Sequence, residues 1–135
     1  MTTITRRTCL HEAAHAVMGL LVGAKLEHVS VVPQEGSKGR TIADSPTQWG
    51  DVMIATAGHV AECIEFGFDN NARDADRLLV HHLTGGIDYA EYQRAAKWML
   101  MMHWKSVLAL ADALATRYTL TGDEVREIVG KLAPN

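Results

Sequence analysis

One short segment near the amino terminus restricts the folds open to this chain more than any other. The segment Leu10 to Val17 reads Leu-His-Glu-Ala-Ala-His-Ala-Val and is mostly apolar. Residues four apart share one face of an α-helix, so His11 and His15 would present two imidazoles to one point. Glu12 is rotated by about 100° from His11 and would flank that point without occupying it. The segment therefore predicts a helix with a candidate metal site, in which Glu12 is placed to act as a general base.

The same pattern also has a simpler interpretation. The chain has seven His, and a motif this short can arise by chance. Two His on an apolar helix can also form a partly buried polar pair. Spacing alone therefore leaves a purely structural role open.

Composition excludes several classes of protein. A chain of 135 residues that is 47% hydrophobic and 21% charged is expected to form one soluble domain, residues 1–135. A net charge of −3 without a basic run argues against a nucleic-acid partner. No apolar run approaches the roughly 20 residues that cross a bilayer, so no membrane association is expected. Cys9 and Cys63 do not make a disulfide framework and no secretory signal is visible, which favours the cytoplasm.

The hydrophobic periodicity and the positions of Gly and Pro predict a mainly α fold with a small β-sheet (α+β). Thr5 or Thr8 is expected to cap the first helix, and Gly23 to end it. The other expected elements are a strand at 26–32, a short pairing strand at 40–43, helices at 45–67, 72–83 and 89–118, and a last helix at 124–131.

A third ligand is needed, because a catalytic zinc has three protein ligands and one open position. Asp74 lies in the first turn of a predicted helix, where the helix dipole favours an acid for purely structural reasons. Sequence position alone does not decide which of several residues is the third ligand. The chemically suitable residues are Glu62, Glu65, Asp69, Asp74, Asp76, His59, His81 and His82.

Five segments carry a resemblance that spans most of the chain in the correct order. Arg6 to Ala16 is similar to a short basic lead followed by His-Glu-Ala-Gly-His-Ala, and Val29 to Pro33 to a Val-Ser-Ile-Ile-Pro strand. Ala57 to Gly67 resembles an Ala-Gly-Arg-Ala-Ala-Glu-Glu helix that ends in Phe-Gly. Arg73 to Ala75 matches part of Asn-Asp-Leu-x-x-Ala, and Tyr118 to Arg126 resembles Thr-Leu-Asp-Gly-Asp-Glu-Ile. The motifs that these five segments resemble belong to the peptidase domain of the FtsH family of zinc proteases.

The resemblance implies a zinc endopeptidase in which His11, His15 and Asp74 hold zinc and Glu12 is the general base. A water activated by the metal would attack the peptide bond. Glu62 would be structural, because its position in the family is not that of the ligand. No Gly-x-x-x-x-Gly-Lys-Ser/Thr loop occurs, and the family's ATPase module and membrane anchor are absent from this sequence. We therefore expect ATP-independent cleavage of unstructured or small polypeptides.

Substrate binding is expected on the predicted strand that follows the motif helix. Val29, Ser30, Val31 and Val32 form this strand, and Pro33 stops it. Because proline cannot donate to a ladder, the strand is expected at a sheet edge. An extended peptide would then pair with that edge by β-augmentation, beside the metal.

A different class of function stays open, that of a non-catalytic, metal-stabilised interaction or regulatory module. A stripe of large apolar side chains would serve as a partner or self-association surface if exposed, and as helix-packing core if buried. Its residues are Trp98, Met99, Met101, Met102 and Trp104. A third alternative is a regulatory peptidase that cuts one protein partner. The sequence leaves the substrate and homo-oligomer formation undecided.

Overall fold

The computed structural model describes residues 4–33, 39–67 and 89–130. The fold is mainly α with one three-stranded antiparallel sheet, as the sequence predicts. The elements in chain order are α1 (Arg6–Leu21), β1 (Lys25–Ser30), β2 (Arg40–Asp44), α2 (Gln48–Phe66), α4 (Tyr89–Met102), α5 (Trp104–Arg117), β3 (Thr119–Thr121) and α6 (Gly122–Val129).

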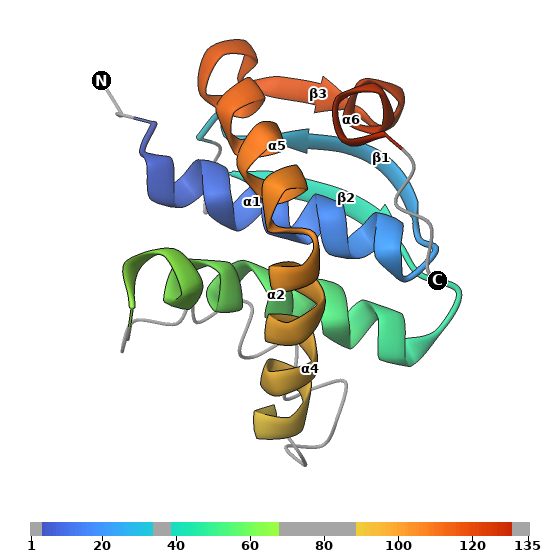
Figure 1. Ribbon diagram of the computed structural model, residues 1–135. Helices are drawn as coiled ribbons and strands as arrows, with labels where there is room; N and C mark the ends of the chain where they lie inside the picture. Colours follow the sequence, from blue (N-terminus) through green and yellow to red (C-terminus); the bar gives the residue numbers. More distant parts are fainter. Residues whose placement is uncertain (1–3, 34–38, 68–88, 131–135) are drawn as a thin grey trace.

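Helix α1 lies at the centre of the structure. The sheet covers one side of it, α2 runs along another, and α5 crosses it (Figure 1). Thirteen of its 16 residues are buried, and small side chains such as Ala13 and Ala16 allow its neighbours to approach closely. Thr5 caps the helix by accepting a hydrogen bond from the Thr8 N–H, and Gly23 follows its end at φ +77°. The His-Glu-x-x-His motif is therefore held inside the protein.

The sheet order is β2-β1-β3, which makes β1 the central strand. Val29 pairs with Thr41 of β2 on one side and with Leu120 of β3 on the other. The expected edge position of Val29 to Val32 is therefore wrong. Pro33 lies beyond the last residue of β1, Ser30, so it does not interrupt the ladder and gives no information about the edge.

Two further features differ from the sequence-based expectation. Strand β3 was not predicted, since three residues give too short a pattern for recognition. The single helix expected at 89–118 is two helices that meet at His103, whose φ of −121° lies outside the helical range. No Gly or Pro marks this break. It lets α4 pack mainly on α2 while α5 packs mainly on α1.

Helix α2 packs against α1 on the side of the two motif histidines. Thr47 caps it by accepting from the Gly50 N–H, and Gly67, at φ +82°, ends it. The helix expected at 72–83, which contains Asp74, lies outside the described residues. Within the described part of the chain, no helix is both long and apolar enough to cross a membrane.

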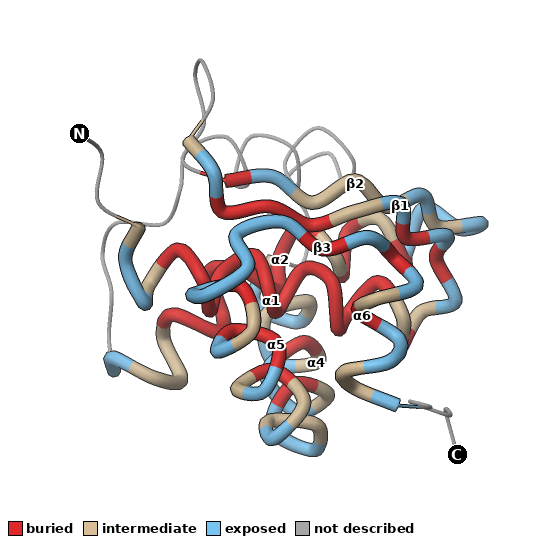
Figure 2. The backbone as a smooth tube through the Cα atoms, turned by 90° about the horizontal axis from the view of Figure 1, so that it is seen from above, coloured by how far each residue is buried: buried red, intermediate tan, exposed pale blue. Residues whose placement is uncertain are grey.

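The burial pattern separates the centre of the molecule from its periphery. Figure 2 shows α1 almost wholly buried, whereas exposed, intermediate and buried residues alternate along α4 and α6. In the apolar stripe of α4 and α5, Met99 and Trp104 pack on the core, while Trp98, Met101 and Met102 are more than half exposed. The stripe is therefore divided between core and surface.

Candidate metal centre

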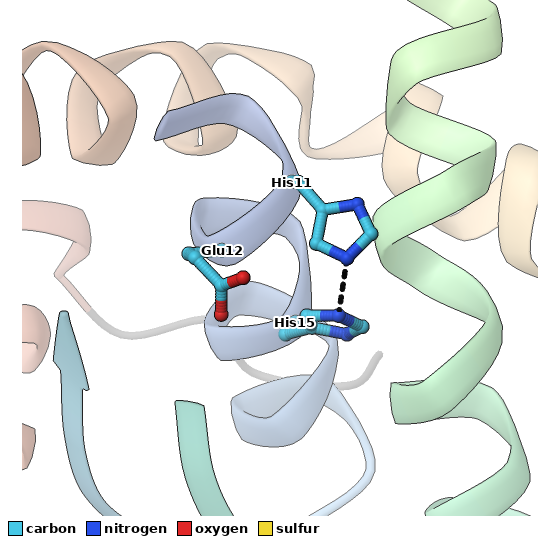
Figure 3. Close-up of side chains that lie close together, drawn as sticks. All are labelled: His11, Glu12 and His15. Carbon is cyan, nitrogen blue, oxygen red and sulfur yellow. Dashed lines mark hydrogen bonds between the residues drawn. The ribbon is translucent and has the colours of Figure 1, made fainter. Parts of the chain in front are cut away.

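Helix α1 brings His11, Glu12 and His15 together, as the motif predicts (Figure 3). One nitrogen or oxygen atom of each side chain lies within 4.8 Å of those of the other two. All three side chains are buried. In the described part of the chain, this is the one group of three or more His, Cys, Asp or Glu side chains close enough to share a metal ion.

The two imidazoles meet through their Nε2 atoms. These atoms are 3.0 Å apart, and the rings lie edge to face at an interplanar angle of 84°. Both rings lie on the side of α1 that faces α2, whereas the Glu12 carboxyl group lies on the side toward the strands, still within 4.8 Å of the ring nitrogens (Figure 3). A ligand between the two Nε2 atoms would therefore have Glu12 beside it and α2 behind it.

The partners of the two Nδ1 atoms determine which nitrogens carry protons. The His15 Nδ1 lies 2.5 Å from the Ile54 carbonyl oxygen, which can only accept, so Nδ1 donates. The His11 Nδ1 donates to the Glu62 carboxylate at 3.2 Å. With both Nδ1 atoms donating, the two Nε2 atoms face each other, and their 3.0 Å separation is that of a hydrogen bond. Either a proton or a metal cation could bridge the two Nε2 atoms.

Zinc fits this arrangement. Two nitrogens bound at 2.0–2.1 Å in a tetrahedral shell lie about 3.3 Å apart. The observed separation of 3.0 Å therefore needs an opening of only a few tenths of an ångström. A hydrogen bond from each Nδ1 to a carboxylate or a backbone carbonyl is also the usual support of metal-binding His. The donor set therefore suits a metal of the zinc type.

Glu12 is fixed from the sheet side of α1. Its Oε1 accepts a hydrogen bond of 2.9 Å from the Thr41 hydroxyl of β2. The backbone of Gly39 passes so close that an added Cβ would lie 2.9 Å from the Glu12 Cγ. Strand β2 therefore orients the carboxylate and limits its movement.

Helix α2 can lie against the imidazoles because of Gly58. A Cβ at this position would lie 2.5 Å from the His11 Nε2 and 2.7 Å from the His15 Nε2. Atoms of this kind do not approach so closely, and the space between the rings and α2 is therefore available only with glycine here.

The other proposed third ligands on α2 have different surroundings. Glu62 lies on the Nδ1 side of His11, away from the two facing nitrogens. Glu65 pairs with Arg6 at 3.0 Å, and the His59 Nε2 lies 3.5 Å from the Cys63 sulfur. None of the three belongs to the cluster of His11, Glu12 and His15. The remaining candidates lie outside the described residues: Asp69, Asp74, Asp76, His81 and His82.

The cysteines take no part in the cluster. Burial raises the pKa of the Cys63 thiol, the neighbouring Glu62 carboxylate raises it further, and burial likewise raises the pKa of Cys9. Both thiols are therefore protonated at neutral pH, which makes them poor nucleophiles and poor metal ligands.

Sequence reasoning missed Thr41, and it considered Glu62 as a ligand or a structural residue without finding its contact with the His11 Nδ1. One signal was available for Glu62, because a carboxylate among the apolar residues of α2 has to find a buried partner. Nothing in the local sequence identifies Thr41, whose contact with Glu12 spans 29 positions.

Residues 4–68 match the model of a family described as Peptidase M50B-like. The match covers just under half of the chain and includes α1, β1, β2 and α2, and thus every residue of the centre described above. No curated protein matches the chain. The family match and the His11–Glu12–His15 cluster together support a metallopeptidase-like protein with a metal cofactor, without singling out the FtsH family.

Proposed function

We propose that this protein is a zinc-dependent endopeptidase of the His-Glu-x-x-His type, with FtsH-like site chemistry. The observation that supports it best is the pair of buried imidazole Nε2 atoms that lie 3.0 Å apart, with a buried carboxylate beside them. His11 and His15 would hold the metal. Asp74, which the sequence resemblance favours, is the proposed third ligand.

A bound zinc supplies a Lewis acid that polarises a peptide carbonyl and lowers the pKa of a water molecule. Glu12 accepts a proton from the attacking water and delivers it to the leaving amine nitrogen. The Thr41 hydroxyl, through its hydrogen bond to Oε1, keeps the carboxylate in one orientation during both transfers. Burial of Glu12 keeps competing solvent away from the proton.

The substrate is proposed to be an extended, unstructured polypeptide. Among the described strands, β2 pairs with β1 alone, so its outer edge has no strand partner. Strand β1 is paired on both sides, so of the described strands only β2 and β3 present a free edge, and we propose that of β2 as the one on which a peptide backbone adds by β-augmentation. Thr41 on β2 contacts Glu12, and a peptide on this strand would therefore lie near the general base. The mechanism uses no nucleotide, and cleavage is proposed to be ATP-independent.

Cleavage of casein or of a peptide library, without nucleotide and with zinc present, tests this proposal. The wild type should cleave, a chelator should stop the reaction, and Glu12→Gln should abolish it while zinc is still bound. Glu127→Gln makes the same chemical change at an exposed helical position and should cleave like the wild type. Full activity of Glu12→Gln would contradict the general-base role, and activity that survives complete zinc removal would contradict the metal chemistry.

A non-catalytic interaction module is the second candidate, favoured by the exposure of Trp98, Met101 and Met102 on α4. Such a module would bind zinc and a protein or second copy without cleaving peptides. Stoichiometric zinc with no cleavage of any library peptide would favour it, particularly if Trp98→Ala then weakened self-association in analytical ultracentrifugation.

A further inference from the structure

The face of α2 that meets the imidazoles is formed by three residues spaced four positions apart. Ile54, Gly58 and Glu62 lie one turn apart, and they face His15, the space between the rings, and His11 respectively. Figure 3 shows both rings turned toward this helix. The two candidate ligands of α1 thus donate their Nδ1 hydrogen bonds to acceptors on one helix, 39 to 51 positions away in the sequence.

Glu62 is the charged member of this face and is almost completely buried, at 1% exposure. Its two carboxylate oxygens have different partners. Oε2 accepts from the His11 Nδ1 at 3.2 Å, and Oε1 accepts from the Arg7 Nε at 2.6 Å. The Arg7 guanidinium in turn lies 5.9 Å from the centre of the Phe66 ring. A buried carboxylate is costly unless paired, and Arg7 provides the compensating charge.

We infer that Glu62 is the positioning residue of this centre and that Arg7 holds Glu62 in place. By accepting from Nδ1, the carboxylate keeps the proton of His11 there and leaves Nε2 as the metal-binding atom. Arg7 keeps the carboxylate at that position by binding its other oxygen. The inference deepens the proposed function by naming the groups that prepare His11, and it rests on that function only for the identity of the metal.

A glutamine at position 62 provides a sharp test because it has a single acceptor oxygen. In Glu62→Gln, either Arg7 or the His11 Nδ1 faces an amide N–H₂ group, and one donor loses its acceptor. Adding Arg7→Met removes the competing donor, so the amide oxygen can serve His11 alone. The double variant should therefore recover part of what Glu62→Gln loses, which is not expected if position 62 only fills space.

Arg6 offers a matched control for Arg7. Both arginines lie in the first turn of α1 and pair with a glutamate of α2, but Arg6 binds the more exposed Glu65. Arg6→Gln therefore removes two surface ion pairs, with Glu65 and with Asp112, without touching Glu62. Surface pairs of this kind contribute little to stability.

The experiment combines Zn²⁺ affinity, from competition with a chromophoric chelator, with the His11 tautomer, from long-range ¹H–¹⁵N NMR of the metal-free protein. We expect Zn²⁺ affinity to fall roughly 10- to 100-fold in Glu62→Ala, less in Glu62→Gln, and less again in Arg7→Gln. Arg6→Gln should match the wild type. The His11 Nδ1–H signal should weaken in the Glu62 variants and partly return in the double variant.

Wild-type affinity and an unchanged His11 tautomer in Glu62→Gln would overturn the inference, even if Glu62→Ala failed to fold. The result is separable from the proposed function. If zinc binds and the Glu62 variants weaken it but no peptide is cut, the positioning role stands and the protease proposal fails. If the wild type binds no zinc, the tautomer signal alone decides: its loss in Glu62→Gln supports the role, and its persistence overturns it.

Discussion

Helices α1 and α4 are both rich in apolar residues, but they are buried to very different extents. Thirteen of the 16 residues of α1 are buried, whereas α4 buries only Ala96 and Leu100 of its 14. Packed elements surround α1, so its polar side chains must find partners within the protein. The side chain of Trp98 on α4 instead remains 66% exposed. The comparison teaches that the candidate metal centre lies where polar side chains are buried and hydrogen-bonded to neighbouring elements.

The largest effect expected from this difference concerns stability. Leu10 on α1 is completely buried, and Leu10→Ala should lower the free energy of unfolding by roughly 2–5 kcal/mol through lost burial and a cavity. Trp98→Ala on α4 removes a larger side chain but should change it by only about 0.5 kcal/mol. Urea unfolding of both variants measures the two changes in the free energy of unfolding. Equal losses would mean that α4 is covered and that the comparison is wrong.

Gly58→Ala sharpens the comparison at the centre itself. The added methyl group would collide with the His11 and His15 rings, so we expect a loss of about 1–3 kcal/mol of stability together with loss of zinc binding. Gly19→Ala is the matched control, since its nearest neighbour would be 3.6 Å away and the substitution should be neutral or stabilising. Thermal unfolding and zinc titration distinguish them. Normal zinc binding by Gly58→Ala would show that α2 can move aside.

Thr41→Val tests the contact that β2 makes with Glu12. The substitution keeps the shape of the side chain and removes the hydroxyl that donates to Oε1. Losing a hydrogen bond to a charged group costs roughly 1.5–3 kcal/mol, so we expect kcat/KM to fall at least about tenfold. Zinc affinity should stay unchanged, because Thr41 contacts neither imidazole in the described structure. A fall in zinc affinity alone would assign Thr41 to the metal site instead.

The smallest effect is expected at the periphery, in α6. The hydrogen bond from the Thr121 backbone lowers the pKa of Glu124, and the nearby Arg117 adds to this. Because the pKa is lower in the folded state, the carboxylate stabilises the protein above its unfolded pKa, and this contribution disappears as the pH falls through the lowered value. Glu124→Gln should flatten this part of the acid dependence of urea unfolding. An unchanged profile would mean that the capping box of α6 contributes nothing measurable.

Local signals predicted much of the fold. Thr5 caps α1, the helix expected to reach residue 67 ends there, the strand expected at 40–43 is β2, and the last helix expected at 124–131 is α6. Each of these depends on a few neighbouring residues, which a single sequence displays. The placing of His11, Glu12 and His15 together on α1 follows in the same way from helical spacing.

Features that depend on distant contacts could not be predicted. The central position of β1 requires β3, and the Ser30 and Thr119 hydroxyls that bond at 2.8 Å are 89 positions apart. The break at His103 reflects the different packing partners of α4 and α5 and has no local sequence signal. The role of Glu62 depends on α2 lying against α1. Asp74, the ligand chosen by resemblance, stays a prediction.

Elemental analysis of purified protein tests the central claim most directly, with wild type measured beside His15→Ala and Asp74→Ala. If His11 and His15 hold a zinc ion between their Nε2 atoms, the wild type should contain about one equivalent per chain and His15→Ala almost none. Asp74→Ala should also lose most of its zinc if it supplies the third ligand. A wild type that contains no stoichiometric metal after saturation with zinc, or a His15→Ala variant that retains it, would contradict the account.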